Sequence, residues 1–218
     1  MDDLLARFRR LDSGSISDAL DRHGLSGGCL GIAPVCAGVK AVGRAFTVKY
    51  RVRGHSGAGT VGDFLDDVPA DSIVVIDNAG RNYATVWGDI MTTHARARGV
   101  AGAVIDGVCR DVPLIRELAY PIFTRGVFMM TGKDRVEIDT VQSAVSVAGV
   151  SVVPGDFVLG DDSGVVVVPA AMAERIAKTA EEIQSTEAEI LALLKAGSTL
   201  RDARRKLGYH ALQSKSRD

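Results

Sequence analysis

The sequence predicts an α/β fold, a β/α sandwich with a partly parallel central sheet and a C-terminal helix. Two continuous apolar runs, Ser72–Asp77 (SIVVID) and Val100–Asp106 (VAGAVID), are typical of parallel strands that are covered on both faces. A helical pattern follows each of these runs, as in a β-α-β-α succession. A third observation is the long apolar stripe at helical spacing between Ala170 and Ala196.

The other elements follow from the same kinds of pattern. β-branched segments bounded by turn residues predict strands at Phe46–Val52, Ser72–Asp77, Val100–Asp106 and Gly164–Val168. Periodic apolar positions predict helices at Ser17–His23, Asp89–Arg98, Val112–Ala119 and Ala170–Ala196. Partly alternating residues on either side of Gly149 predict a hairpin with arms at Val141–Val147 and Val150–Val158.

Length and composition indicate one globular domain. The chain has 218 residues, of which 46% are hydrophobic and 24% charged. We expect residues 1–198 to form a single α/β domain. Residues 199–218 carry six Lys or Arg against two Asp and are expected to form a polar basic tail. The net charge of −1 and the aromatic content of 5% argue against nucleic acid or a membrane as partner.

The cysteines and the first residues suggest a location in the cell. Cys29, Cys36 and Cys109 form no CxxC pair and no cluster with histidine, so neither a zinc site nor a disulfide framework is predicted. The opening residues are acidic and then basic, without an apolar stretch typical of a secretory signal. We therefore expect a cytoplasmic protein.

Two loops lie where open α/β sheets bind their ligands, beyond the carboxyl ends of parallel strands. One follows SIVVID and leads into Trp87–Met91 at the start of a helix. The other follows VAGAVID and runs from Gly107 to Asp111, just before the next helix. If the two strands are neighbours joined by a right-handed crossover, both loops open at the same edge.

The two loops carry complementary chemistry. Backbone N–H groups of Gly88, Asp89, Ile90 and Met91 at a helix N-terminus suit a carboxylate or phosphate, and Gly88 lets a ligand approach closely. Arg110 can grip a carboxylate or a 2-oxo acid. Asp111 can hold Mg²⁺ or Mn²⁺, and Asp89 can orient a water. The sequence therefore predicts a small 2-oxo acid substrate and a divalent metal cation as cofactor.

Each residue also has a structural interpretation. Asp111 directly precedes a helix with Pro113 in its first turn, so on local sequence a helix N-cap is favoured over a metal ligand. Asp89 can be a first-turn acid that the helix dipole favours, and an arginine such as Arg110 on a surface loop is usually solvated.

A second motif has a weaker context. Gly57–Gly62 matches GxGxxG, and Asp77 follows Gly57 by twenty residues, as in dinucleotide-binding proteins. The preceding strand alternates instead of being continuously apolar, and the helix that follows is short. We therefore prefer a flexible glycine-rich loop that closes over the site.

Six further side chains are candidates for chemistry. His94 is expected to be a packed or capping residue, and Cys109 a small loop residue without a partner base. The lysines that a Schiff base would need, Lys40, Lys49 and Lys133, are expected away from both loops. Glu187 interrupts the apolar stripe of the last helix and predicts either the edge of that face or a subunit contact.

Several segments together resemble the family of 4-hydroxy-4-methyl-2-oxoglutarate / 4-carboxy-4-hydroxy-2-oxoadipate aldolases, which includes the regulator of ribonuclease activity A. Asp89 and Arg110-Asp111 are separated by twenty residues, as in that family's pattern. Further similarity lies in the segments Gly88-Asp89, Ala101–Gly107, Ser17–Leu20, Val153–Asp156 and Gly160–Pro169. The resemblance covers about residues 12 to 197.

The resemblance implies a metal-dependent pyruvate aldolase on the swivelling β/α fold, assembled as a homotrimer or a dimer of trimers. It implies that Asp111 supports the metal, that Arg110 binds the 2-oxo acid and that Asp89 orients a metal-bound water. It also implies that the amides from Gly88 to Met91 hold the carboxylate. A glutamate from the adjacent subunit's C-terminal region assists in such enzymes, and we assign Glu187 to this role.

We therefore expect a class II carbon–carbon lyase that releases pyruvate from 4-hydroxy-2-oxo dicarboxylic or tricarboxylic acids. Oxaloacetate decarboxylation passes through the same enolate and is expected as well. The presence of Asp111 favours an enzyme over the alternative, a non-catalytic regulator that binds a ribonuclease or another protein. An NAD-dependent enzyme using the Gly57–Gly62 loop is a third interpretation.

Overall fold

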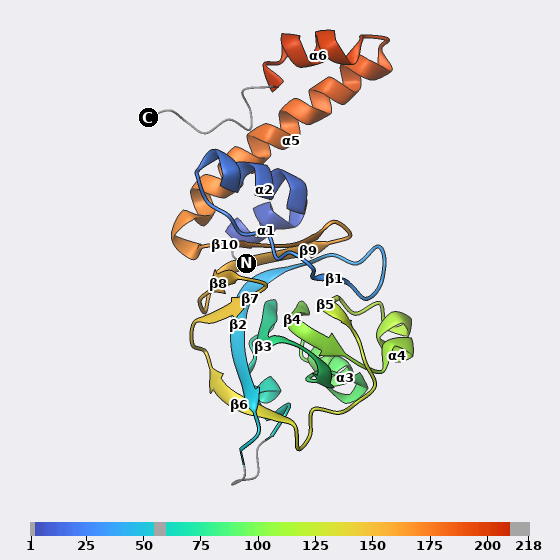
Figure 1. The fold of residues 1–218 in the computed structure, drawn as a ribbon. Helices are drawn as coiled ribbons and strands as arrows, with labels where there is room; N and C mark the ends of the chain where they lie inside the picture. Colours follow the sequence, from blue (N-terminus) through green and yellow to red (C-terminus); the bar gives the residue numbers. More distant parts are fainter. Residues whose placement is uncertain (1–2, 55–59, 210–218) are drawn as a thin grey trace.

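The computed structural model describes residues 3–54 and 60–209 and shows a mixed eight-stranded sheet (Figure 1). The strand order is β1-β5-β4-β3-β2-β9-β10, and β6 pairs with β2 beside this path. A separate hairpin is formed by β7 and β8. The strands are β1 Ala33–Pro34, β2 Ala41–Val52, β3 Ser72–Thr85, β4 Gly102–Cys109, β5 Ile122–Val127, β6 Val136–Val141, β7 Val145–Val147, β8 Val150–Val152, β9 Phe157–Asp161 and β10 Gly164–Val168.

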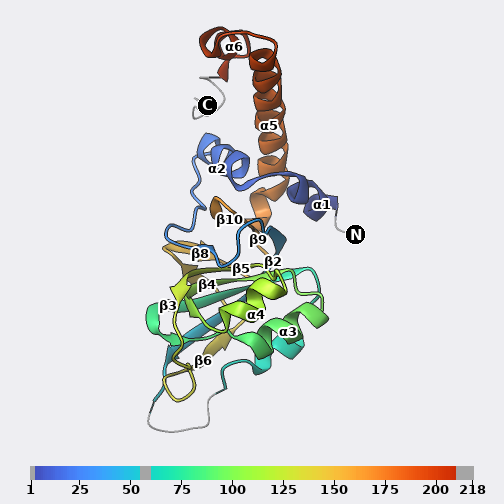
Figure 2. The ribbon, with the colours of Figure 1, turned by 90° about the vertical axis from the view of Figure 1, so that its right-hand side faces the viewer.

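The helices form two groups. In Figure 1, α3 and α4 lie beside the parallel strands, whereas α1, α2 and α5 lie beyond β9 and β10. Figure 2 shows that α5 extends away from the sheet and carries α6 at its far end. The bounds are α1 Asp3–Arg10, α2 Ser13–Arg22, α3 Asp89–Ala97, α4 Val112–Glu117, α5 Ala173–Lys195 and α6 Leu200–Lys206, with short 3-10 helices η1 Asp63–Asp67 and η2 Ala170–Met172.

The centre of the sheet is parallel and buried on both faces. β2, β3, β4 and β5 pair in parallel, in that spatial order. Alternate residues of SIVVID enter different cores: Val74 and Ile76 face the core that includes side chains of α3, α4 and η1, while Ile73 and Val75 face the β7–β8 hairpin. This confirms the predicted α/β class and the partly parallel sheet.

The predicted strand Ser72–Asp77 continues much further than its apolar run. β3 extends to Thr85, and its register against β4 shifts between Asp77 and Arg81 and again before Thr85. Ala79 and Gly80 adopt φ values of 51° and 68°, which lets the strand bulge and resume. The polar residues after Asp77 therefore do not form the expected loop, and the chain leaves the sheet only at Val86.

Several bounds differ from the sequence prediction. The hairpin around Gly149 is present, but its arms are three residues each, because Val141 belongs to β6 and Val158 to β9. Within the region expected to be a basic tail, residues 200–206 form α6, capped by Thr199, whose hydroxyl accepts from the Asp202 N–H. In the described part of the chain, no helix has the length and apolarity needed to cross a membrane.

Candidate functional site

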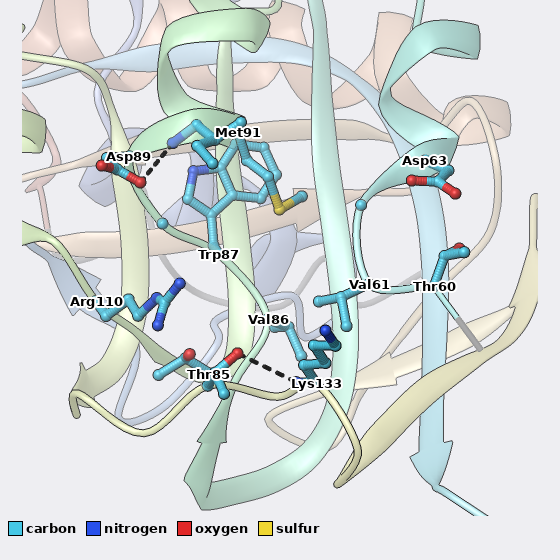
Figure 3. A pocket seen from close by; sticks show the side chains of 14 residues that line it. Thr60, Val61, Asp63, Thr85, Val86, Trp87, Asp89, Met91, Arg110 and Lys133 are labelled. Atoms are coloured by element: carbon cyan, nitrogen blue, oxygen red, sulfur yellow. Dashed lines mark hydrogen bonds between the residues drawn. The ribbon is translucent and has the colours of Figure 1, made fainter. Parts of the chain in front are cut away.

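The two predicted loops meet, because β3 and β4 are parallel neighbours. The Arg110 N–H donates to the Trp87 carbonyl at 3.0 Å and joins the ends of the two segments. A cavity of about 390 Å³ opens there, and we call it the first cavity. In Figure 3, Asp89 and Arg110 lie on one side of it and Thr60 and Asp63 on the other. Its lining is Thr60–Asp63, Thr85–Met91, Arg110, Thr131 and Lys133.

Asp111 occupies the N-cap position of α4 but does not cap it. Its backbone is left-handed, with φ 58° and ψ 37°, and its side chain makes no hydrogen bond to its own helix. Instead, Oδ2 accepts from the Asp89 N–H at 3.1 Å, across to the start of α3. The predicted N-cap position is therefore confirmed, but the side-chain hydrogen bond that an N-cap aspartate usually makes is absent. The carboxylate is directed at the neighbouring loop, where Arg110 Nε lies 3.4 Å from the same oxygen.

Gly88 is required by this arrangement. A Cβ atom at this position would lie 2.5 Å from Asp111 Oδ2 and 3.4 Å from Arg110 Cγ. The backbone of Gly88 is extended, so the residue is needed for space and not for its conformational freedom. The sequence predicts that a ligand approaches this glycine closely; in the structure the approaching group is the Asp111 carboxylate.

The N-terminus of α3 already binds carboxylate oxygens. The Asp89 N–H donates to Asp111, and the Ile90 N–H donates to Asp89 Oδ1 at 2.7 Å. These two amides are among those expected to hold a substrate carboxylate, so the substrate would replace one of these contacts. The preference for anions agrees with the unpaired N–H groups and partial positive charge of a helix start.

Hydrogen bonds among Trp87, Gly88 and Thr92 hold the start of α3 in place. The Thr92 hydroxyl donates to the Gly88 carbonyl at 2.8 Å and accepts from Trp87 Nε1 at 2.9 Å. Trp87 is buried and its ring stacks on Tyr120. Because these contacts fix residues 87–92 to the core, the amides at the start of α3 are held in place before any ligand arrives.

Asp111 fits a divalent cation bound mainly through water and substrate. Its Oδ1 has no hydrogen-bond partner among residues 3–54 and 60–209, and its side chain is 34% exposed. In the same part of the chain, no group of three or more His, Cys, Asp or Glu side chains is arranged to hold a metal. A single hard carboxylate oxygen with open space around it suits Mg²⁺, which keeps several of its waters.

Lys133 belongs to the first cavity, which corrects the expectation that it lies away from both loops. Pairing of Thr131 with Thr85 brings the segment after β5 to this edge, and Thr85 also bonds to the Met130 carbonyl through its N–H and its hydroxyl. Nothing in the local sequence signals this pairing, because it depends on where β3 ends. The cavity therefore has a second cation besides Arg110.

The GxGxxG motif gains no support as a dinucleotide site. Gly57 and Gly59 lie outside the described residues, while Thr60–Asp63 line the first cavity. The helix that follows is the five-residue 3-10 helix η1, so it offers no long helix start to a pyrophosphate. Asp77, the acid at the expected spacing, is buried and accepts from the N–H groups of Ala79 and Ser146.

His94 and Cys109 have no place in the chemistry of the cavity. His94 is neither packed nor capping, since its Nε2 lies 2.7 Å from Asp66 Oδ1 at the surface. Cys109 ends β4 and is buried, and burial raises the pKa of its thiol to about 12. A thiol held protonated in this way is a poor nucleophile.

Glu187 is remote from the other predicted residues within one chain. It lies on α5, in the helix group on the other side of β9 and β10 from α3 (Figure 1). Partial burial and the nearby carboxylates of Asp18 and Asp12 raise the pKa of Glu187. The structure thus brings together Gly88–Met91, Arg110 and Asp111, and the assignment of Glu187 to a neighbouring subunit's site stays a prediction.

Comparisons with known proteins identify relatives of this chain. Protein DlpA of Legionella pneumophila is 38% identical over 211 residues, which are 96% of this chain but only 34% of DlpA. A protein of Halalkalibacterium halodurans named "Putative 4-hydroxy-4-methyl-2-oxoglutarate aldolase" is 32% identical over 85% of each chain. The crystal structure of RraAS2 from Streptomyces coelicolor, described as an unusual member of the RNase ES inhibitor RraA family, superposes with a TM-score of 0.79. It is 27% identical and covers 86% of this chain and 95% of its own.

The family assignment rests on most of the domain. The RraA-like family model, described as Aldolase/RraA, matches residues 13–167. This range contains all strands from β1 to β10 except the last residue of β10. It also contains every residue that lines the first cavity. This chain belongs to the RraA-like family of aldolases and RraA proteins.

Proposed function

We propose that the protein is a divalent-metal-dependent carbon–carbon lyase of the class II pyruvate aldolase type. Its substrates would be 4-hydroxy-2-oxo dicarboxylic or tricarboxylic acids, which it cleaves to pyruvate, and it would also decarboxylate oxaloacetate. The observation that carries the proposal is the Asp111 carboxylate, which leaves its own helix uncapped and lies beside Arg110 at the start of α3. A relative named as an aldolase supports the same chemistry.

Binding of the 2-oxo acid end uses the charges of the first cavity. Arg110 would pair with the C1 carboxylate, assisted by amides of residues 88–91 after Asp89 releases the Ile90 N–H. Mg²⁺ or Mn²⁺ held by Asp111 would polarise the C2 carbonyl as a Lewis acid. Lys133 offers a second positive charge in the cavity for a further carboxylate.

Cleavage requires one proton acceptor and stabilisation of one developing charge. Asp89, acting through a water, would accept the proton of the C4 hydroxyl. As the C3–C4 bond breaks, its electron pair moves to C3 and the C2 oxygen, giving the enolate of pyruvate next to the positive charge of Arg110. Protonation at C3 then yields pyruvate. Oxaloacetate loses CO₂ to the same enolate without needing this base.

Assembly and Glu187 extend the proposal. We propose a homotrimer or a dimer of trimers in which Glu187 reaches the adjacent subunit's site and assists the proton transfer. The support is its position: Glu187 faces the like charges of Asp12 and Asp18, so a cation of another copy would stabilise it. A cytoplasmic location, with no nucleic-acid or membrane partner, also belongs to the proposal. Light scattering coupled to gel filtration would give the mass of the assembly.

The alternative is a non-catalytic regulator that binds a ribonuclease or another protein. The RNase ES inhibitor family to which the Streptomyces structure is assigned favours it. It predicts binding that is insensitive to Mg²⁺ and to substitution of Arg110 or Asp111. The lyase predicts the reverse.

The deciding experiment measures pyruvate release, coupled to lactate dehydrogenase, from oxaloacetate and from 4-carboxy-4-hydroxy-2-oxoadipate. Each substrate is tested with Mg²⁺, with Mn²⁺ and with EDTA. We expect turnover that EDTA abolishes and either metal restores. Turnover that persists in EDTA would overturn the metal dependence, and no turnover of either substrate would favour the regulator.

A further inference from the structure

Two positive charges line the first cavity, and one of them has no partner in the described part of the chain. Arg110 Nε lies 3.4 Å from Asp111 Oδ2. The Lys133 ammonium lines the same cavity but makes no hydrogen bond or ion pair with residues 3–54 and 60–209. In Figure 3, Lys133 lies apart from Asp63 and Asp89, the two carboxylates of the lining. A cation without a partner in a cavity favours an anionic group of the ligand.

The backbone around Lys133 is held against the end of β3. Thr131 pairs with Thr85, which lines the same cavity. The Lys133 N–H donates to the Thr131 hydroxyl at 3.2 Å, and the Arg135 N–H donates to the Gly132 carbonyl at 2.9 Å. A Cβ atom on Gly132 would overlap the Thr85 carbonyl, so the glycine permits this close approach. The base of the Lys133 side chain is therefore fixed at the cavity, while its flexible stem lets the ammonium reach a ligand.

We infer that Lys133 is a specificity-determining residue: its ammonium binds a carboxylate of the substrate's C4 fragment and selects dicarboxylic over monocarboxylic 4-hydroxy-2-oxo acids. This rests on the proposed function, in which Arg110 and the amides of residues 88–91 engage the C1 carboxylate. A second carboxylate in the same cavity needs another cation, and among the described lining residues only Lys133 remains. A second cavity, of about 350 Å³, borders Arg110 and Asp111 but has no further cation among its described lining residues.

Pairing with Lys133 affects the two proposed reactions differently. When 4-hydroxy-2-oxoglutarate is cleaved, the C4 hydroxyl loses its proton, the C3–C4 bond breaks, and the enolate is protonated to pyruvate while glyoxylate leaves. The second carboxylate departs with glyoxylate and keeps its charge, so the pair persists in the transition state and lowers KM with little effect on kcat. In oxaloacetate the second carboxylate itself becomes neutral CO₂, so a cation paired with it gives no help. Lys133 therefore favours aldol cleavage over decarboxylation.

Binding tests the inference without requiring turnover. Calorimetry with Mg²⁺ present would compare 2-oxoglutarate with 2-oxopentanoate, which has a methyl group in place of the second carboxylate; both lack the hydroxyl needed for cleavage. We expect 2-oxoglutarate to bind about tenfold more tightly or better. Lys133→Met should remove this preference and Lys133→Arg, which keeps the charge, should retain most of it. Lys49→Met removes the same charge from an exposed position outside the first cavity and should leave the preference unchanged.

Turnover separates failure of the inference from failure of the proposed function. Pyruvate release from 4-hydroxy-2-oxoglutarate, 4-hydroxy-2-oxopentanoate and oxaloacetate is measured by chromatography. Lys133→Met should raise KM about tenfold for 4-hydroxy-2-oxoglutarate, with little change in kcat, and should leave KM for 4-hydroxy-2-oxopentanoate unchanged. Equal changes for these two substrates, or a preference in binding that Lys133→Met does not alter, overturn the inference while the proposed function stands. Silence of the unmodified protein on all three substrates overturns the proposed function, and the inference with it.

Discussion

Asp12 and Asp111 both directly precede a helix, but their carboxylates bind different partners. Asp12 has an extended backbone, and its Oδ1 accepts from the Ser15 N–H at 2.7 Å, so it caps α2 in the usual way. Asp111 is left-handed and gives its carboxylate to the start of α3 instead of its own helix. An aspartate that gives up a cap worth about 1 kcal/mol, in a conformation uncommon for residues other than glycine, is held there by something other than helix stability.

The surroundings of the two residues repeat this difference. Around α1, α2 and α5, several charged side chains are paired: Arg7 bonds to Glu174 and Glu181, and Asp161 accepts from the N–H and hydroxyl of Ser13. Around α3, Asp111 keeps an oxygen open, and the neighbouring Ile90 is 79% exposed. The contacts of the first region stabilise the fold, whereas the second region leaves groups available to a ligand. Binding sites are often less stable than the rest of a protein for this reason.

Asp111→Asn is expected to have the largest effect on the rate of pyruvate release and little effect on stability. Asparagine tolerates the left-handed conformation and can still accept from the Asp89 N–H, so the fold should be kept. Loss of the negative charge removes the ligand for the cation, and Mg²⁺-dependent pyruvate release should fall by about 100-fold or more. Steady-state kinetics at saturating Mg²⁺ with a thermal unfolding curve would check both points. A variant that retains the Mg²⁺-dependent rate would remove Asp111 from the metal site.

Gly88→Ala tests whether the approach of Asp111 to α3 matters. The added Cβ would lie 2.5 Å from Asp111 Oδ2, so the carboxylate must move, and we expect the rate to fall about tenfold. Gly14→Ala is the matched control, because its Cβ would lie 3.3 Å from Asp12 Oδ1, at the surface of α2. It should leave the rate unchanged. Equal effects of the two substitutions on the rate would contradict the difference between the regions.

The sequence predicted what local pattern determines and missed what tertiary pairing determines. Strands such as Gly164–Val168 and the start of α3 at Asp89 were placed correctly because their patterns are strong. Asp111 takes the predicted N-cap position, but its carboxylate contacts the Asp89 N–H instead of its own helix, and local sequence does not show that contact. Lys133 was missed, because it reaches the first cavity only through the bulged extension of β3 and its pairing at Thr131.

Asp12→Ala should change stability and leave the chemistry alone. Loss of the side-chain cap of α2 is expected to cost about 1 kcal/mol and to lower the Tm by about 2–4 °C for a chain of this length. Pyruvate release per folded molecule should equal that of the unmodified protein. Thermal unfolding and the coupled assay on the same sample would show both. A loss of rate without a loss of stability would mean that α2 takes part in the site, as an adjacent-subunit arrangement would require.

Glu187→Gln is expected to have the smallest effect, a change in Tm whose sign at pH 7 is informative. Partial burial and the carboxylates of Asp18 and Asp12 raise the pKa of Glu187 in the folded chain, so folding disfavours its ionised form. The cost is absent below the unfolded pKa and fully present above the folded one, because the folded state then gives up a proton that it holds more tightly. Glutamine should therefore raise the Tm at pH 7 and leave it nearly unchanged at pH 4.

Glu189→Gln serves as the control for this substitution, since Glu189 lies on the exposed face of the same helix. Thermal unfolding at both pH values should show the pH-dependent gain for Glu187 alone. The opposite sign, a loss of stability at pH 7 that disappears at pH 4, would mean that the Glu187 carboxylate meets a positive charge that the described residues do not supply. Among residues 3–54 and 60–209 the only charged groups found to shift its pKa are carboxylates, so that result would favour placing Glu187 at the site of a neighbouring subunit.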